Sequence, residues 1–378
     1  MAVEMKWGPD LYPTSTAGYV AGHPTPQQFK IVLVRIRTDD IWSELRGTRY
    51  NPPGAAAGDD RRRATYVAAL QQAEELFRAA RTAGPASSPL LQFYGLSQAG
   101  RAIAAAAEDS GDGEWNLSGH GIQARNLTAD LPDIAVLTDT ADKPRSRQTS
   151  FVRLSLILGS PLWGKPQAPT FAQLWDTLPE LINKPLRASG DRRTALIADP
   201  LSGAEQHPLV SADVSGIPGY LARLDATADG FHKFMAAYPT AVGYVPVTTQ
   251  LGVPQYWSEA GYDTVRVRLN WYAGPKYPVA EEVRRDQLHA VLTPYGQGSY
   301  YLLPEVLPGT GPLHPLMAWW VVLYTLSMLA RYQPAEWAAC IDINASPYAA
   351  AVEYLLHESR TALPDLLLIT LRQVAGAC

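Results

Sequence analysis

The chain has 378 residues, a formal net charge of −4, 47% hydrophobic residues and 18% charged residues. This length exceeds that of a usual single domain, so we expect one large domain or two closely packed ones. The charge excludes a generally basic nucleic-acid-binding protein but leaves a local basic patch open.

Cysteine content and hydropathy indicate the compartment. The two cysteines, Cys340 and Cys378, cannot build a disulfide framework, which favours a reducing environment. The first residues lack the basic and apolar regions of a signal peptide. The longest apolar run, residues 316–330, is shorter than the ~20 residues that a membrane-spanning helix needs. We therefore expect a cytoplasmic protein without membrane association.

Residues 1–60 are predicted to form an extended arm and an edge strand. Residues 1–28 are rich in Pro, Gly and Thr, as loops are, and FKIVLVRI at 29–36 is typical of a strand. Residues 61–82 carry apolar side chains at helical spacing and predict an amphipathic helix. Its three opening arginines, at 61–63, are expected to form a solvated helix start.

Residues 90–108 fit two incompatible structures. As strand, turn and helix, Gly95 to Ala99 resembles the nucleophile elbow of a serine hydrolase, with Ser97 as the nucleophile. However, the residues before Gly95 are not β-branched, and no oxyanion motif of the HGG type precedes them. We favour a continuous helix and keep the hydrolase as an alternative.

The helical interpretation gives this segment two distinct faces. Small residues line one face and allow another helix to approach closely: Gly95, Ala99, Ala102 and Ala106. Polar side chains line the other: Tyr94, Gln98 and Arg101.

Residues 129–311 are predicted to form a β-rich middle lobe. Short runs rich in β-branched and aromatic residues predict strands at 151–158, 242–249, 264–271 and 300–303. The alternation of Val265, Val267, Leu269 and Trp271 with polar residues indicates a half-buried strand. Frequent Pro and Gly favour a small antiparallel sheet with long loops, and 171–181 is predicted as a short helix.

The helical period returns in the last part of the chain. Helices are predicted at 316–330, 334–341, 347–363 and 364–374, of which the last three each begin with a proline. We expect residues 61–128 and 312–378 to form one helical bundle. The predicted fold class is therefore α+β.

Several motifs together resemble the YaaC-like family of bacterial proteins. They are FYGLSQAGRAIAAA, then SGHGI, then LSMLARYQPAEW, and finally ALPDLLL, so the resemblance covers about residues 90–375. The family has no assigned biochemical activity, so the resemblance implies relatives but no mechanism.

The helix with FYxxSxAxRAI, followed by a His-Gly loop, also resembles the central helix of HEPN-type domains. That resemblance implies a helical bundle of the kind found in toxin ribonucleases and phage-defence proteins, where an Arg is followed by a His five to seven positions later. Arg284 and His289 have this spacing. In such a pair, the imidazole acts as general base on a ribose hydroxyl and the guanidinium stabilises phosphorane charge. The alternative is a solvated helix face.

Four further residues are candidate ligand contacts. Gln98 and Arg101 lie on the polar stripe, and the glycines beside His120 would let a ligand approach the backbone. Arg331 ends an apolar helix, where it would also satisfy the last carbonyls. If Arg331 faces Arg101 across the bundle, the two would share an anion.

No metal or cofactor site is predicted, because the seven histidines lack ligand spacing and no phosphate-binding loop is present. The leading hypothesis is a protein that binds or cleaves RNA or a nucleotide, in a stress or phage-defence setting. The first alternative is a non-catalytic interaction protein whose bundle mediates homodimerisation or docking to a protein partner, and the second is the hydrolase.

Overall fold

The computed structural model describes residues 26–376 apart from 109, 112, 143–147, 165–166, 188–191, 202–207, 224–226, 260–262, 275–277 and 297. The chain divides into two units, Met1–Arg37 and Thr38–Cys378. All packing described below lies within the second unit. Residues 1–25 of the predicted arm lie outside the described residues.

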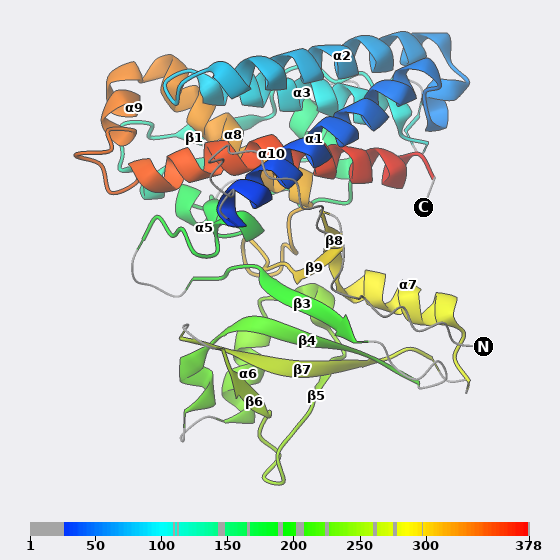
Figure 1. The fold of residues 1–378 in the computed structure, drawn as a ribbon, viewed down its shortest axis with the longest axis vertical. Helices are drawn as coiled ribbons and strands as arrows, with labels where there is room; N and C mark the ends of the chain where they lie inside the picture. Colours follow the sequence, from blue (N-terminus) through cyan, green and yellow to red (C-terminus); the bar gives the residue numbers. More distant parts are fainter. Residues whose placement is uncertain are drawn as a thin grey trace, which may run out of the picture. The chain divides into compact units, whose positions relative to one another are not determined.

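Long helices make one layer of the second unit (Figure 1). Their bounds are α1 Pro26–Tyr50, α2 Asp60–Thr82, α3 Ser88–Ala106, α8 Pro315–Tyr332, α9 Pro334–Cys340 and α10 Ala349–Val374. Helix α3 packs against α2, α8 and α10, so it lies at the centre of the layer. Two shorter helices, α4 Ser150–Ile157 and α5 Phe171–Trp175, pack beside it and beside α8 respectively.

Helix α3 confirms the prediction of a continuous helix at 90–108. Its C-terminal half is buried on every side, because residues 102–107 are all at most 2% exposed. The two glycines of α3 lie against different helices. Gly95 lies against Phe77 of α2, whereas Gly100 lies against Trp320 of α8.

The predicted edge strand at 29–36 is wrong, because these residues lie within helix α1. A short apolar run has the same composition in a strand and in a buried helix, so it does not distinguish them. The continuation of the segment does distinguish them. Ile41, Trp42 and Leu45 recur at helical spacing and are at most 6% exposed.

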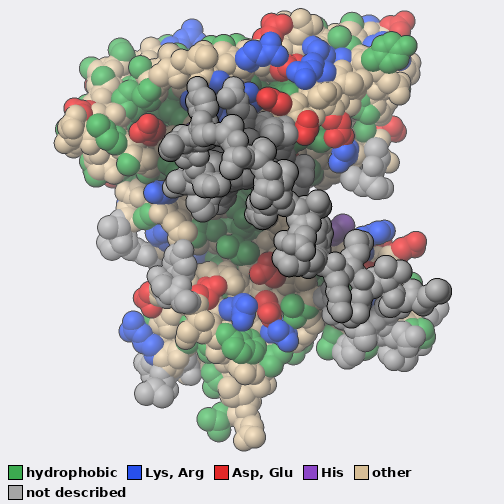
Figure 2. All heavy atoms as spheres, in the orientation of Figure 1, with side chains coloured by type: hydrophobic (Ala, Val, Ile, Leu, Met, Phe, Trp, Pro, Cys, Tyr) green, Lys and Arg blue, Asp and Glu red, His purple; other side chains and the backbone are tan. Residues whose placement is uncertain are grey.

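Ion pairs join α1 to α2 around one buried carboxylate. Glu74 is 7% exposed, and its Oε1 accepts hydrogen bonds from Arg46 of α1 at 2.6 Å and from Arg78 at 2.7 Å. Figure 2 shows basic and acidic side chains interspersed over this face. A buried carboxylate held by two guanidinium groups is satisfied and also sets the position of α1 on α2.

Two other expectations about elements are corrected. Residues 151–158 form helix α4 and no strand, because Phe151, Val152 and Leu154 are all buried, which removes the polar-apolar alternation that marks a strand. Residues 349–374 form the single helix α10, with Pro364 inside it, where two helices were expected at 347–363 and 364–374. Proline removes one helical hydrogen bond, but the buried leucines on both sides of Pro364 keep the helix packed.

A sheet of antiparallel strands makes the second layer. Its order is β5-β7-β4-β3-β9-β8, and β6 also pairs with β7. The bounds are β3 Leu196–Leu201, β4 Leu209–Pro218, β5 Val245–Pro246, β6 Tyr256–Ser258, β7 Thr264–Tyr272, β8 Thr293–Tyr295 and β9 Ser299–Leu302. A separate hairpin joins β1 Ile122–Arg125 to β2 Ala135–Thr138. The predicted small antiparallel sheet is confirmed.

Strand β7 pairs with β4, β5 and β6 and has the predicted alternation. Its buried side chains are Val265, Val267, Leu269 and Trp271, and they join a sheet core with α6 Ala228–Met235. On the other face, Arg268 makes a two-point contact with Asp213 of β4, at 2.7 and 3.1 Å. Helix α7, Glu281–Val291, follows β7 and contacts β4 and β8.

The protein therefore has an α+β fold with two hydrophobic cores. The sheet core is formed by residues between 196 and 302. The helical core includes residues between 131 and 186, which the sequence assigns to the middle lobe. Among the described residues, no helix has the length and hydropathy to cross a bilayer.

Candidate functional site

The loop after α3 is held to the helices by buried arginines. Arg62 of α2 is 6% exposed, and its Nη1 donates a hydrogen bond to the carbonyl oxygen of Ala107 at 2.9 Å. Arg153 of α4 donates from Nη1 to the carbonyl oxygen of Gly113 at 3.0 Å. Arg62 thus satisfies a carbonyl at the end of α3 and is not the solvated helix start that the sequence suggested.

Arg101 fixes the next part of the same loop. It is half-buried on α3, and its Nη1 donates to the carbonyl oxygen of Leu117 at 2.5 Å. Because a carbonyl is neutral, this bond supplies no counter-charge to Arg101, and no ion pair of Arg101 is found among the described residues.

The backbone around His120 is tightly constrained. Gly119 and Gly121 both have positive φ, 64° and 76°, and a Cβ on Gly121 would collide with Oγ1 of Thr149. The amide of Phe151 donates to the carbonyl oxygen of His120 at 3.0 Å. The space beside Gly121 is therefore filled by Thr149, so this glycine serves packing and does not open the backbone to a ligand.

His120 is an exposed residue, but its imidazole is partly covered by an aromatic cluster. Its ring centre lies 6.0 Å from that of Phe93 on α3 and 5.8 Å from that of Tyr324 on α8. These rings restrict the imidazole to one side and leave another side open.

Arg331 reaches the same surface from the last turn of α8. Its Nη1 donates to the hydroxyl of Tyr94 on α3 at 2.9 Å, and its guanidinium lies 5.0 Å from the ring centre of Tyr332. Both Arg331 and Tyr332 are exposed. Arg331 of α8 is thus tied to α3, the helix that also carries Arg101.

The pKa of His120 depends on its surroundings. Burial lowers the pKa of His120, and the positive charges of Arg331 and Arg101 lower that pKa further. Within the described part of the chain, neither arginine forms an ion pair with a carboxylate. Two guanidinium groups therefore lower the pKa of one imidazole, and neither is ion-paired among the described residues. The nearest acidic group that the hydrogen bonds place by this loop is Asp139, whose carboxylate accepts a hydrogen bond from Thr149. A bound anion would pair with the two guanidinium groups.

Gln98 lies next to this surface. It is half-buried on α3, one turn after Tyr94 and almost one turn before Arg101. In the described structure its amide has no protein hydrogen-bond partner, so its amide nitrogen can donate to a ligand.

The predicted pair Arg284 and His289 lies on α7, and its side chains leave the helix in different directions. Five residues correspond to about 140° around a helix. Arg284 is 6% exposed and donates to the carbonyl oxygen of Leu209 at 3.2 Å. His289 is exposed and stacks on Tyr300, with ring centres 6.0 Å apart. The structure thus gives the two side chains different surroundings.

Ser97 lies in the middle of α3, eight residues or more from either end. A nucleophile elbow requires a sharp turn between a strand and a helix. That turn is not present at Ser97, so the described geometry offers no support for the hydrolase.

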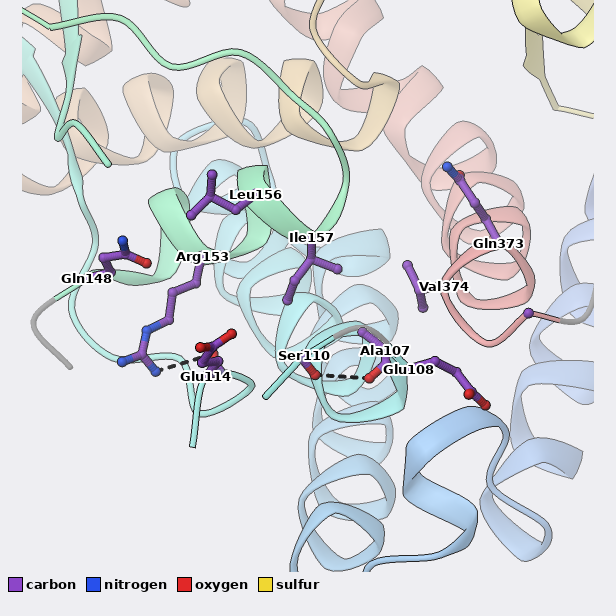
Figure 3. A pocket seen from close by; sticks show the side chains of 11 residues that line it. Ala107, Glu108, Ser110, Glu114, Gln148, Arg153, Leu156, Ile157, Gln373 and Val374 are labelled. Atoms are coloured by element: carbon purple, nitrogen blue, oxygen red, sulfur yellow. Dashed lines mark hydrogen bonds between the residues drawn. The ribbon is translucent and has the colours of Figure 1, made fainter. Parts of the chain in front are cut away.

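A cavity of about 620 Å³ opens between the loop after α3, helix α4 and the end of α10 (Figure 3). Arg153, Glu114 and Gln373 are among its polar lining residues, and Leu156, 52% exposed, adds apolar surface. Sequence analysis missed Arg153, although a lone arginine inside the apolar run FVRLSLI is a visible signal. Since its Nη1 donates to loop carbonyls, Arg153 has a structural role here.

Among the described residues, no group of three or more His, Cys, Asp or Glu side chains is arranged to hold a metal ion. A model of the family described as YaaC-like Protein matches residues 45–371. The match includes every residue of the surface formed by Arg101, His120 and Arg331. No curated protein and no solved structure matches the chain.

Proposed function

We propose that this chain, which belongs to the YaaC-like family, binds RNA or a nucleotide. Arg101 and Arg331 would hold a phosphate of that ligand. One observation carries the proposal. Arg331 is hydrogen-bonded to Tyr94 of α3, both arginines are close enough to His120 to lower its pKa, and neither forms an ion pair with a carboxylate among the described residues. A phosphate supplies the missing negative charge.

The donors on this surface suit a phosphate. Guanidinium groups bind phosphate oxygens through charge-assisted hydrogen bonds, often in pairs. Neutral His120 and the amide of Gln98 add uncharged donors. Tyr332, 56% exposed beside Arg331, offers a ring on which a base can stack. These features favour a nucleotide or a single-stranded RNA over a bare inorganic anion.

The surface also supports cleavage of RNA as a second activity. A neutral imidazole can accept the proton of a ribose 2′-hydroxyl, and the lowered pKa of His120 keeps it neutral at physiological pH. The two guanidinium groups would then stabilise the charge of the phosphorane. His120→Gln is expected to abolish cleavage of a labelled RNA while retaining its binding.

The test is binding of a fluorescent single-stranded oligoribonucleotide and of AMP to the full chain. Arg331→Ala removes a charged donor and is expected to weaken binding by about tenfold or more. Arg285→Ala is the matched control, since Arg285 is an exposed arginine on α7 away from this surface. Equal loss in both variants, or no binding by the wild type, would refute the proposal and favour a non-catalytic interaction protein.

A further inference from the structure

Tyr324 of α8 packs against His120, but the phosphate contacts proposed above do not involve it. Only 5% of this tyrosine is exposed. Its ring centre lies 5.3 Å from that of Phe93 and 5.8 Å from that of His120. These contacts hold the ring of Tyr324 in one position.

The hydroxyl of Tyr324 is available to a ligand. It is not enclosed by protein atoms, and it forms no hydrogen bond within the described part of the chain. Burial, with a smaller effect of Tyr332, raises the pKa of Tyr324 to about 12. The hydroxyl therefore stays protonated at pH 7 and can donate to an acceptor. A fixed ring with an unpaired hydroxyl is a preorganised hydrogen-bond donor.

Tyr324 and Arg331 lie on one face of α8. Arg331 follows Tyr324 by seven residues, which is about two helical turns and about 10 Å along the axis. Two neighbours connect these residues. Tyr332 lies 5.0 Å from the guanidinium of Arg331 and also affects the pKa of Tyr324. His120 contacts the ring of Tyr324 and responds to the charge of Arg331. A ligand beside His120 is therefore next to both Tyr324 and Arg331.

Charge and the number of oxygens distinguish two kinds of phosphate at such a place. A phosphomonoester carries a charge of about −1.5 to −2 at pH 7 and has three terminal oxygens. A phosphodiester within an RNA carries a single negative charge and has only two such oxygens. Arg101 and Arg331 supply two positive charges, and neither is ion-paired to a carboxylate among the described residues. The monoester matches this charge better.

We propose that this surface selects a phosphomonoester, the terminal phosphate of a nucleotide or of an RNA end, and that the hydroxyl of Tyr324 contributes to this selectivity. The inference rests on the phosphate binding proposed above. The guanidinium groups of Arg101 and Arg331 pair with two of the terminal oxygens, and Tyr324 donates to the third. An internal phosphodiester lacks that third oxygen, so it binds more weakly and leaves Tyr324 without a partner.

Two matched pairs of ligands test the preference in titrations of the full chain. The first pair is AMP and its phosphate methyl ester, which is a diester. The second is one fluorescent oligoribonucleotide with and without a 5′-phosphate. The ligand with the monoester is expected to bind about tenfold more tightly in each pair. A preference in the first pair alone supports a free nucleotide as the source of the monoester, and a preference in both supports an RNA end as well.

Tyr324→Phe keeps the packed ring and removes the hydroxyl. It is expected to weaken AMP binding about tenfold and to reduce the preference for AMP over its methyl ester. Its melting temperature is expected to equal that of the wild type, because the hydroxyl has no hydrogen bond to lose within the described residues. Tyr272→Phe is the matched control, since Tyr272 is an exposed tyrosine on β7, and it is expected to bind AMP as the wild type does.

Equal affinities for the monoester and the diester in both pairs would overturn the inference. So would a Tyr324→Phe variant that keeps the preference of the wild type, because a purely structural role weakens both ligands equally. The proposed function is unaffected by these results if Arg331→Ala still weakens the binding of both oligoribonucleotides. Absence of binding for all four ligands refutes the proposed function itself, and the inference with it.

Discussion

At the scale of single residues, the site depends on how the backbone presents His120. Gly119 and Gly121 share a positive φ, so alanine at either position brings a backbone strain of about 1–2 kcal/mol. At Gly121 the new Cβ would also collide with Thr149, whereas at Gly119 the nearest atom, Cγ2 of Thr149, is 3.4 Å away.

We therefore expect Gly121→Ala to lower the free energy of unfolding by at least about 1 kcal/mol more than Gly119→Ala does. The two changes have the same chemistry, so their difference isolates the contact with Thr149. Urea denaturation measures both. Equal losses of unfolding free energy would show that the loop moves away from Thr149 and so does not fix the position of His120.

Sequence analysis selected Arg101, Gln98, His120 and Arg331 because polar groups on an otherwise small or apolar helix, and a histidine between glycines, need partners. In the structure Arg101 and Arg331 both influence the pKa of His120, and Gln98 lies on the same stripe of α3 as Arg101. Sequence analysis could not select Arg62 or Arg153, because their hydrogen-bond partners are carbonyls about 40 residues away in the chain. Helical spacing within one element carries no information about such distant carbonyls.

At the scale of elements, the crossing of α3 and α8 depends on Gly100. A Cβ there would lie 2.6 Å from Trp320 and 3.0 Å from Leu154. Alanine is the better helix former by about 1 kcal/mol, but overpacking costs about 1–3 kcal/mol. We expect Gly100→Ala to destabilise the protein on balance.

Gly47 in α1 provides the control, because nothing lies within 4 Å of its added Cβ. Gly47→Ala is expected to raise the free energy of unfolding by about 0.5–1 kcal/mol. Opposite signs for the two variants in urea denaturation would support the close crossing of α3 and α8. A gain of stability in both would contradict it.

Elements with strong periodicity and clear ends could be predicted from the sequence. Helix α2 begins after Asp59, whose side chain accepts hydrogen bonds from two amides of the first turn, and β7 alternates as expected. The errors at 29–36 and 151–158 share one cause. Each is a short apolar run without a clear period, and such a run occurs both in strands and in buried helices.

At the scale of the whole molecule, a buried titratable group links the helical core to strand β8 of the sheet. Glu180 follows α5, and both its carboxylate oxygens accept hydrogen bonds from the hydroxyl of Tyr295 on β8, at 2.9 Å each. Trp319 of α8 donates to the same hydroxyl at 3.0 Å. Burial is the main cause that raises the pKa of Glu180 to about 7, and the charge of Glu358 adds to it.

Glu180 and His314 have opposite effects on stability as the pH changes. His314 caps α8, because its Nδ1 accepts a hydrogen bond from the amide of Leu316, and burial lowers its pKa to about 4. Between pH 4.5 and 7 the folded protein binds more protons at Glu180 than the unfolded chain does, so stability falls as pH rises. Between pH 4 and 6.5 the unfolded chain binds more protons at His314, so stability rises with pH. Each contribution amounts to about 3 kcal/mol over its window, and the two offset each other where the windows overlap.

Glu180→Gln and His314→Asn separate these contributions, since the amide of asparagine can still cap α8. Relative to the wild type, Glu180→Gln is expected to gain stability as pH rises from 4.5 to 7. His314→Asn is expected to lose stability relative to the wild type as pH rises from 4 to 6.5. Urea denaturation across this range measures both. Parallel pH profiles for the wild type and the two variants would contradict the buried states of both groups.

The lobes were the least predictable level of structure. The sequence indicated a bundle and a sheet, but residues 131–186 pack into the helical core even though they are interrupted by prolines and glycines. Composition placed them with the sheet, because loop-rich segments have no period that reveals which core they cover. Large buried side chains such as Phe171 and Trp175 place this segment in the helical core, and their contacts are visible only in the tertiary structure.

The central claim is that Arg101 and Arg331 hold a phosphate beside His120. An NMR titration of His120 tests it most directly, with the resonance assigned by its loss in His120→Gln. In the free protein, the pKa of His120 should lie below that of an ordinary histidine, and Arg331→Ala should raise it. Saturating AMP should raise the pKa in the wild type, because its phosphate offsets the arginine charges, and should raise it less in Arg331→Ala. A pKa in the wild type that is the same with and without AMP would contradict the account.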